Sequence, residues 1–184
     1  VSKKIAAGIQ HVINAGDKEG GARPSRVIKY EPLLIKAAGM DATMLHVGRS
    51  SQDMHATYYS AIMRDNVLRL SSQLSTTMEL LNKLAKANED TIVPNYTNGV
   101  AAQPNSYAHY LQGLLAGFKR DSKRLQEFYV RLNLCPMGTT VLNGTSWPLN
   151  RDKMAHYLGF AGLVEDAYDA SQIKPVDEPI ELSA

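Results

Sequence analysis

The stretch SSQDMHATYYSAIMRDNVLRLSSQLSTTMELLNKLAKANEDTI, residues 50–92, contains neither glycine nor proline. In its second half, apolar residues recur at spacings of three and four: Leu70, Leu74, Met78, Leu81 and Leu84. This spacing predicts one very long amphipathic helix, or two nearly continuous helices. At ~1.5 Å per residue, such a helix is a rod of roughly 50 Å.

A second long helix is predicted further along the sequence, with Asn105 or Ser106 as its N-cap and its end at Cys135–Pro136. Its buried stripe is marked by Tyr107, Leu111, Leu114, Phe118, Leu125, Phe128 and Leu132. Helices this long are typical of elongated bundles, which often complete their packing with other chains. The fold class is therefore predicted to be all-α.

Shorter helices are predicted over Lys3–Ala15, Glu31–Ala38 and about Arg151–Leu158. The stretch between the second long helix and residue 151 is irregular, and the proline-broken segment from Ile173 onward is expected to be a connector. No internal repeat and no β-type alternation of useful length is found, so residues 91–104 are expected to form a loop.

The composition suits a soluble globular protein, with 44% hydrophobic residues, 21% charged residues and a formal net charge of +2. Lys and Arg are scattered, which disfavours a nucleic-acid surface. The single cysteine, Cys135, excludes an intrachain disulfide, fits a reducing compartment and is predicted to be a small buried residue. The sequence begins without a signal-peptide pattern and has no run of about 18 apolar residues, which predicts a cytoplasmic protein.

A polar segment, HVGRSSQD, residues 46–53, immediately precedes the first long helix. The free N–H groups of a first helical turn attract anions, and Arg49 can hold a carboxylate with two hydrogen bonds. Alternatively, Ser50 or Ser51 simply caps the helix. For this segment taken alone, the cap is the favoured interpretation.

A second polar segment, TIVPNYTNGVAAQP, residues 91–104, joins the two long helices. It is longer than most connections in helical bundles. It is rich in side-chain amides and hydroxyls, from Thr91, Asn95, Tyr96, Thr97, Asn98 and Gln103. These features favour a functional loop over an ordinary interhelix connection.

Taken in order, these two segments and PMGTTVLNGTSWPLNRD, residues 136–152, resemble the argininosuccinate lyase branch of the fumarase/aspartase superfamily. The family patterns are H-x-G-R-S-x-N-D, P-G-Y-T-H-L-Q-x-A-Q-P and P-L-G-x-x-x-L-x-G-T-x-x-P-x-D-R. The sequence departs from them at Gln52, where Asn is usual, at Asn98, where His is usual, and at Asn150, where Asp is usual. The matches include His46, Gly48, Arg49, Ser50, Asp53, Pro94, Tyr96, Thr97, Gln103, Pro104, Pro136, Gly138, Gly144, Thr145, Pro148 and Arg151.

The resemblance implies a long-helix bundle in which residues 1–45 end an N-terminal helical domain and residues 46–184 begin the central bundle domain. It also implies a homotetramer whose active sites are shared between subunits. No cofactor and no metal is implied. The family's serine loop, of the form G-S-S-x-M-x-x-K-x-N, does not occur in this sequence. The chain is therefore expected to be truncated at both ends and, alone, inactive.

The implied reaction is β-elimination of fumarate from an N-substituted aspartate such as argininosuccinate, by cleavage of a C–N bond. By the same resemblance, Arg49, Ser50, Gln52 and Gln103 bind substrate, and Thr97 and Asn98 take the catalytic positions. Asn98 cannot titrate near neutral pH as the family's histidine does. This predicts weaker acid assistance, a different leaving group or lost activity. The alternatives are another superfamily lyase with a different leaving group and a non-catalytic or divergent homologue.

Overall fold

The computed structural model describes residues 1–184, which form two compact units. The first unit comprises residues 1–59 and 134–177, and the second comprises residues 60–133 and 178–184. Helix α3, Ser51–Lys86, contributes residues to both units. The predicted domain division after residue 45 concerns the arrangement of a larger protein and stays a prediction.

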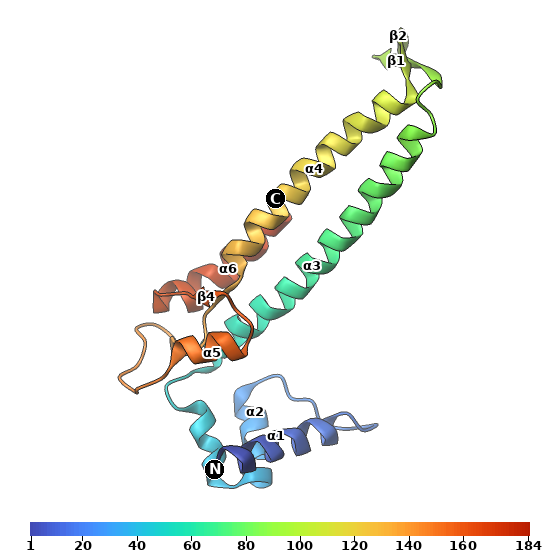
Figure 1. Ribbon diagram of the computed structural model, residues 1–184. Coiled ribbons are helices and arrows are strands. Elements are labelled where there is room, and N and C mark those ends of the chain that lie inside the picture. Colours follow the sequence, from blue (N-terminus) through green and yellow to red (C-terminus); the bar gives the residue numbers. More distant parts are fainter. The chain divides into compact units, whose positions relative to one another are not determined.

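In the first unit, helix α1, Ser2–Gly16, packs against helix α2, Val27–Ala38 (Figure 1). The two helices approach closely because Gly8 has no side chain: a Cβ there would lie 2.6 Å from the Cβ of Ala38. Helix α1 matches the predicted helix closely. Helix α2 begins four residues before the expected start and includes Pro32, which costs it one internal hydrogen bond.

The rest of the first unit is built from short elements. A 3₁₀ helix, η1 (Met40–His46), leads toward α3, and α5 (Arg151–Tyr157) confirms the predicted helix at that position. Strands β3 (Leu134–Cys135) and β4 (Gly162–Leu163) pair in parallel, and η2 (Asp169–Ile173) is a π-helical turn. Cys135 is fully buried, as predicted.

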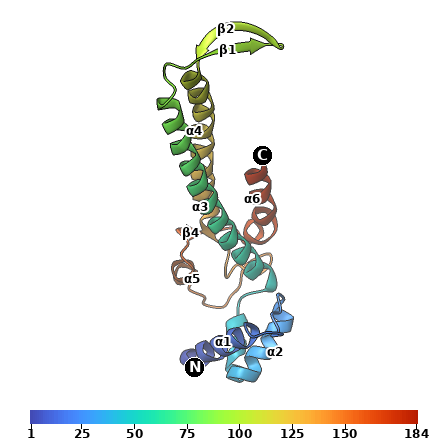
Figure 2. The same cartoon turned by 90° about the vertical axis from the view of Figure 1, so that its right-hand side faces the viewer.

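In the second unit, α3 and α4 (Tyr107–Leu132) run antiparallel and side by side (Figures 1 and 2). Helix α3 is one continuous helix of 36 residues, and Ser106 caps α4 by accepting a hydrogen bond from His109 N at 3.1 Å. Both features confirm the sequence predictions. The core of this unit is Val67, Phe128 and Leu132, with Met63, Leu125, Tyr129 and Leu182 packed against them.

A β-hairpin replaces the loop that was expected between the long helices. Strands β1 (Ile92–Thr97) and β2 (Val100–Ser106) pair antiparallel, with Thr97 opposite Val100. Asn98 and Gly99 form the turn with φ values of 49° and 79°. Asn-Gly favours this two-residue turn because both positions need positive φ. Sequence analysis missed the strands because most of their residues are exposed and none is buried, so no apolar alternation marks them.

The expected connector after Ile173 is in fact helix α6, Lys174–Ser183. Pro175 lies in the first turn, where its missing N–H costs no internal hydrogen bond. Only Pro179 lies inside the helix, and the packing of Leu182 in the second unit's core helps to stabilise the last turn. The prediction was wrong because both prolines were treated as helix breakers.

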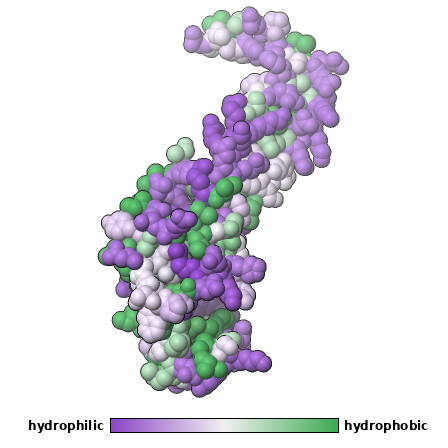
Figure 3. All heavy atoms as spheres, turned by 60° about the vertical axis from the view of Figure 1, so that its left-hand side comes forward, coloured by the Kyte–Doolittle hydropathy of each residue, from purple (hydrophilic) through white to green (hydrophobic).

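Helices dominate both units, which confirms the predicted long-helix fold class with four short strands added to it. No helix is both long and apolar enough to cross a membrane. On the face drawn in Figure 3, hydrophilic side chains predominate along the long helices, whereas hydrophobic side chains gather over the N-terminal helices.

Candidate active site

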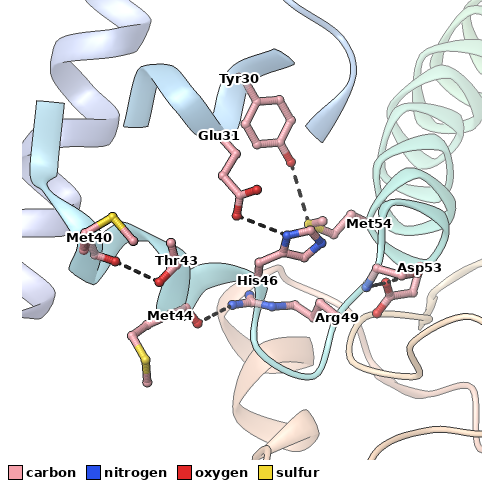
Figure 4. A network of polar contacts seen from close by, with 10 residues as sticks. Tyr30, Glu31, Met40, Thr43, Met44, His46, Arg49, Asp53 and Met54 are labelled. Carbon is pink, nitrogen blue, oxygen red and sulfur yellow. Dashed lines mark hydrogen bonds and ion pairs between the residues drawn. The ribbon is translucent and has the colours of Figure 1, made fainter. Parts of the chain in front are cut away.

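The polar segment of residues 46–53 forms the entry to α3. The hydroxyl of Ser50 accepts a hydrogen bond from Gln52 N at 3.1 Å. Oδ1 of Asp53 in turn accepts one from Ser50 N at 2.7 Å (Figure 4). These reciprocal bonds satisfy two free N–H groups of the first turn in the manner of a capping box. Ser50 is therefore the N-cap of α3, as the favoured interpretation predicted.

Asp53 joins this cap to a turn far along the sequence. It is fully buried, and its Oδ2 accepts hydrogen bonds from Gly138 N at 2.8 Å and Thr140 N at 3.3 Å. One carboxylate thus fixes both the start of α3 and the turn after Pro136. Sequence reasoning did not assign Asp53 to the site. The spacing Ser50-x-x-Asp53, which is a capping-box signature, was the signal that could have found it.

The side chain of Gln52 also takes part in packing the first unit. Its Nε2 donates a hydrogen bond to the carbonyl of Ser171 at 3.0 Å, and Ser171 is fully buried. A side-chain amide nitrogen carries two hydrogens, so one N–H of Gln52 is engaged and the other is available.

Arg49 is partly buried and has no carboxylate bound to it. Its Nη2 lies 3.4 Å from the carbonyl of Met44, and its Nε is buried without a hydrogen-bond partner (Figure 4). Burial lowers the pKa of Arg49, while the nearby Asp53 and Tyr30 oppose that change. A partly buried guanidinium whose buried Nε–H has no acceptor is suited to bind an anion that could accept from it.

A cavity of about 510 Å³ lies beside Arg49 within the first unit. Its lining is mainly apolar, with Tyr30, Glu31, His46 and Arg49 among the polar residues that face it. Burial and the charge of Glu31 raise the pKa of Tyr30, and the charge of Arg49 opposes the rise. The Tyr30 hydroxyl approaches the Met54 sulfur at 3.7 Å.

Three histidines that lie in or near the polar segments, His46, His55 and His109, each contact a group of the protein. His46 Nδ1 lies 3.1 Å from a carboxylate oxygen of Glu31, which supports a structural role. His55 contacts the carbonyl of Ser25, and His109 contacts the side chain of Asn105 at the base of the hairpin. Of these three residues, His109 lies in the same unit as the hairpin, and its ring contacts Asn105 and not Thr97 or Asn98.

The hairpin carries the other predicted site residues. Thr97 and Asn98 lie at its tip, and Gln103 lies opposite Asn95 on the partner strand. Thr97, Asn98 and Gln103 are exposed, and their side chains make no hydrogen bond within the protein. Their donors and acceptors are therefore available. The structure brings Arg49, Ser50 and Gln52 together in the first unit and Thr97, Asn98 and Gln103 together in the second.

The third matched stretch has a structural function in the first unit. Asn150 caps α5 by accepting a hydrogen bond from Lys153 N at 2.8 Å. Asp and Asn cap helices equally well, so the departure from the family pattern at this position is conservative. Arg151 donates to the carbonyls of Met137 and Val164, which ties the turn after Pro136 to β4. No group of three His, Cys, Asp or Glu side chains is arranged to hold a metal ion.

Comparison with known proteins identifies the class to which this fold and these segments belong. A sequence model described as "Lyase" matches residues 20–184, and the chain belongs to that family. Within the family it is an argininosuccinate lyase-like member of the fumarase/aspartase superfamily. Over 171 residues it is 37% identical to an argininosuccinate lyase of Oceanobacillus iheyensis, a match that covers 91% of this chain and 37% of that protein.

Solved structures agree with this assignment. A crystal structure of EDDS lyase in complex with formate superposes with a TM-score of 0.89 at 32% identity, covering 95% of this chain and 35% of that one. A variant of EDDS lyase with bound fumarate gives a TM-score of 0.88 with the same coverage. The chain thus spans little more than a third of the length of these relatives.

Proposed function

We propose that the protein is a lyase that releases fumarate from an N-substituted aspartate such as argininosuccinate. The observation that carries this proposal is the 37% identity to an argininosuccinate lyase along 91% of the chain. The similarity to an EDDS lyase that binds fumarate supports fumarate as the product.

In the proposed reaction, a base removes a proton from Cβ of the substrate, and the electron pair forms the C=C bond of fumarate as the C–N bond breaks. The departing amine takes a proton from an acid. Negative charge gathers on the carboxylate next to Cβ before the bond breaks. The site must therefore hold donors around that carboxylate and place a base beside Cβ.

Arg49, Ser50 and Gln52 are assigned to bind substrate carboxylates. The unpaired buried Nε of Arg49 and the second amide hydrogen of Gln52 support this role. The Ser50 hydroxyl accepts from Gln52 N and lies 3.3 Å from Asp53, so its own hydrogen can be donated to Asp53 or to a substrate.

Thr97 and Gln103 are assigned to the half of the site carried by the hairpin. Thr97 donates to the carboxylate that gains charge, and Gln103 binds substrate or fixes the hairpin. Their exposed and unengaged side chains support these roles. Asn98 donates a hydrogen bond near the leaving group but supplies no proton, because an amide does not titrate in this range. Removal of the Cβ proton is assigned to the family's serine loop, whose pattern does not occur in residues 1–184.

The proposed assembly is a cytoplasmic homotetramer whose active sites combine residues from several subunits. Exposed apolar side chains on the long helices support an association: Leu68 is 52% exposed, Leu80 60% and Val130 70%. Light scattering after size-exclusion chromatography tests the number of subunits. A monomer that is active would contradict shared sites.

The function is tested by supplying argininosuccinate to the native gene product that contains this sequence. Fumarate formation is then measured by its ultraviolet absorbance. Arg49→Ala should raise KM strongly, whereas Arg120→Ala, an exposed change on α4, should leave the kinetics unchanged. The absence of fumarate from every N-substituted aspartate supplied would contradict the proposal. Turnover by the 184-residue chain alone would contradict the assignment of the base.

The residue at position 98, Asn98, favours a second candidate function. An amide at the position where the family has histidine is compatible with a non-catalytic or divergent homologue, or with a lyase whose leaving group needs less acid assistance. A panel of aspartates whose N-substituents differ in basicity separates these cases. A lyase with poor acid assistance should prefer the least basic leaving group, and a non-catalytic homologue should process none.

A further inference from the structure

We propose that Asn98 is a site of spontaneous deamidation, through a succinimide formed with Gly99. Two Asn-Gly sequences occur in the protein, Asn98–Gly99 and Asn143–Gly144. Asparagine is among the thermally labile residues, and glycine leaves the following backbone nitrogen unobstructed because it has no Cβ. The two sites differ in structure in a way that predicts which of them reacts.

The chemistry needs only water. The backbone nitrogen of Gly99 attacks Cγ of Asn98 and loses its proton, a new C–N bond forms, and the bond from Cγ to Nδ2 breaks as ammonia leaves with a proton. Water then opens the succinimide ring at either carbonyl. Opening at one carbonyl gives aspartate, and opening at the other gives isoaspartate, in which the backbone runs through Cβ and Cγ of the residue.

The surroundings of Asn98 permit this attack. Both residues lie in the turn at the tip of the hairpin, Asn98 is exposed, and no atom lies within 4 Å of the position of a Cβ on Gly99. The N–H of Gly99 donates to no group of the protein. The Gly99 nitrogen therefore has open space around it and makes no hydrogen bond that must break before it attacks Cγ of Asn98.

Asn143 provides a matched comparison within the same protein. It is also exposed and also precedes a glycine with positive φ, 75° at Gly144. The Gly144 N–H, however, donates to the carbonyl of Thr139 at 3.0 Å. Attack by this nitrogen requires that bond to break first, which should slow the reaction about fivefold at the net strength of one hydrogen bond.

The modification changes the hairpin at the residue to which the proposed function assigns a catalytic position. Deamidation replaces a neutral amide with a carboxylate beside Thr97. Isoaspartate also lengthens the backbone of a two-residue turn, which disturbs the pairing of Thr97 with Val100. The modification itself rests on the geometry of the turn and does not depend on the proposed function.

The test is a time course of the folded protein in mildly alkaline buffer, digested and analysed by mass spectrometry with fragment ions that locate each amide-to-acid change. We expect Asn98 to deamidate about fivefold faster than Asn143 in the folded protein. In urea the two rates should become nearly equal, because the local sequences are alike. Asn98→Gln should remove the signal at residue 98 without altering that at residue 143.

Equal rates at Asn98 and Asn143 in the folded protein, or a faster rate at Asn143, would overturn the proposal. A ratio that is the same in urea as in the folded protein would also overturn it, because the difference would then come from sequence and not from structure. The readout is a mass, so a failure of the proposed lyase activity leaves this result unaffected.

Discussion

The carboxylate of Asp53 accepts a hydrogen bond from the backbone N–H of Gly138 at 2.8 Å, although 85 residues separate the two in sequence. The same carboxylate accepts from Ser50 N at the start of α3. One fully buried side chain therefore holds together two of the three segments by which the protein resembles its family.

Asp53→Asn should lower the free energy of unfolding by about 2–4 kcal/mol, because an amide has one acceptor oxygen and leaves a buried N–H unsatisfied. Urea unfolding followed by circular dichroism measures the change. Asp65→Asn, an exposed position on the same helix, is the control and should change stability little. An Asp53→Asn protein as stable as the control would show that these bonds contribute nothing net.

Gly48 lies just before the cap with φ of 63°, and a Cβ there would lie 2.6 Å from Cδ1 of Leu149. Gly48→Ala should therefore destabilise the protein by about 2–4 kcal/mol, from left-handed strain and steric overlap together. Gly113→Ala should have the opposite effect on stability, because Gly113 lies within α4 and has open space around it.

The Gly113→Ala protein should be more stable than the native one by about 0.5–1 kcal/mol, since alanine favours a helix interior over glycine. Thermal unfolding of both variants measures the two effects. A similar loss of stability in both would mean that Gly48 is not constrained by its surroundings.

Asn98→His should increase the rate of fumarate formation in the native gene product, by as much as ~100-fold, because imidazole can transfer a proton near neutral pH. Histidine tolerates the left-handed conformation of this turn position better than most residues do. Initial rates with argininosuccinate measure the effect, and Asn95→His, on the adjoining strand β1, is the control. Unchanged or lower turnover in the Asn98→His protein would contradict the hypothesis that an acid at residue 98 assists the reaction.

Ionisation of Tyr30 should lower the free energy of unfolding at alkaline pH. Its pKa in the folded protein is raised above the ordinary value of 10.0, mainly by burial. Above about pH 10 the folded state therefore binds more protons than the unfolded state, and the free energy of unfolding decreases as the pH rises. Urea unfolding at about pH 9 and about pH 11, on either side of the ordinary pKa, measures this slope.

Tyr30→Phe should reduce that alkaline loss of stability, whereas Tyr157→Phe, at a residue that is 81% exposed, should leave it intact. The same loss in the Tyr30→Phe protein as in the native one would place the titrating group elsewhere.

The long helices were predictable because their signals are local. The absence of glycine and proline from residues 50–92 and the apolar spacing within this range were sufficient for α3. Asn105 or Ser106 was the predicted N-cap of α4, and the structure has Ser106 there. The hairpin has no hydrophobic face, so the periodicity that identifies most strands is missing. The Asn98–Gly99 dipeptide was the remaining signal, and it lay between two prolines that favoured a loop.

For the candidate site, the sequence predicted a cap at Ser50 or Ser51 but not the hydrogen-bond partners of Gln52 and Asp53. Gln52 donates to a carbonyl 119 residues away, and Asp53 accepts from the turn after Pro136. Contacts over such distances depend on how the polypeptide folds back on itself, and no local pattern encodes them. The structural roles of Gln52 and Asp53 could be seen only in the folded protein.

The exposure of the hairpin has a consequence for its motion. Ile92 is 71% exposed, Tyr96 64% and Val100 67%, so the strand pair buries too little apolar surface to be stable by itself. The amide hydrogens of the hairpin should exchange with solvent far sooner than those around the core of Val67, Phe128 and Leu132. Local opening of the hairpin breaks few contacts. The segment that carries Thr97 and Asn98 can therefore open and close many times during the lifetime of the folded helices beneath it.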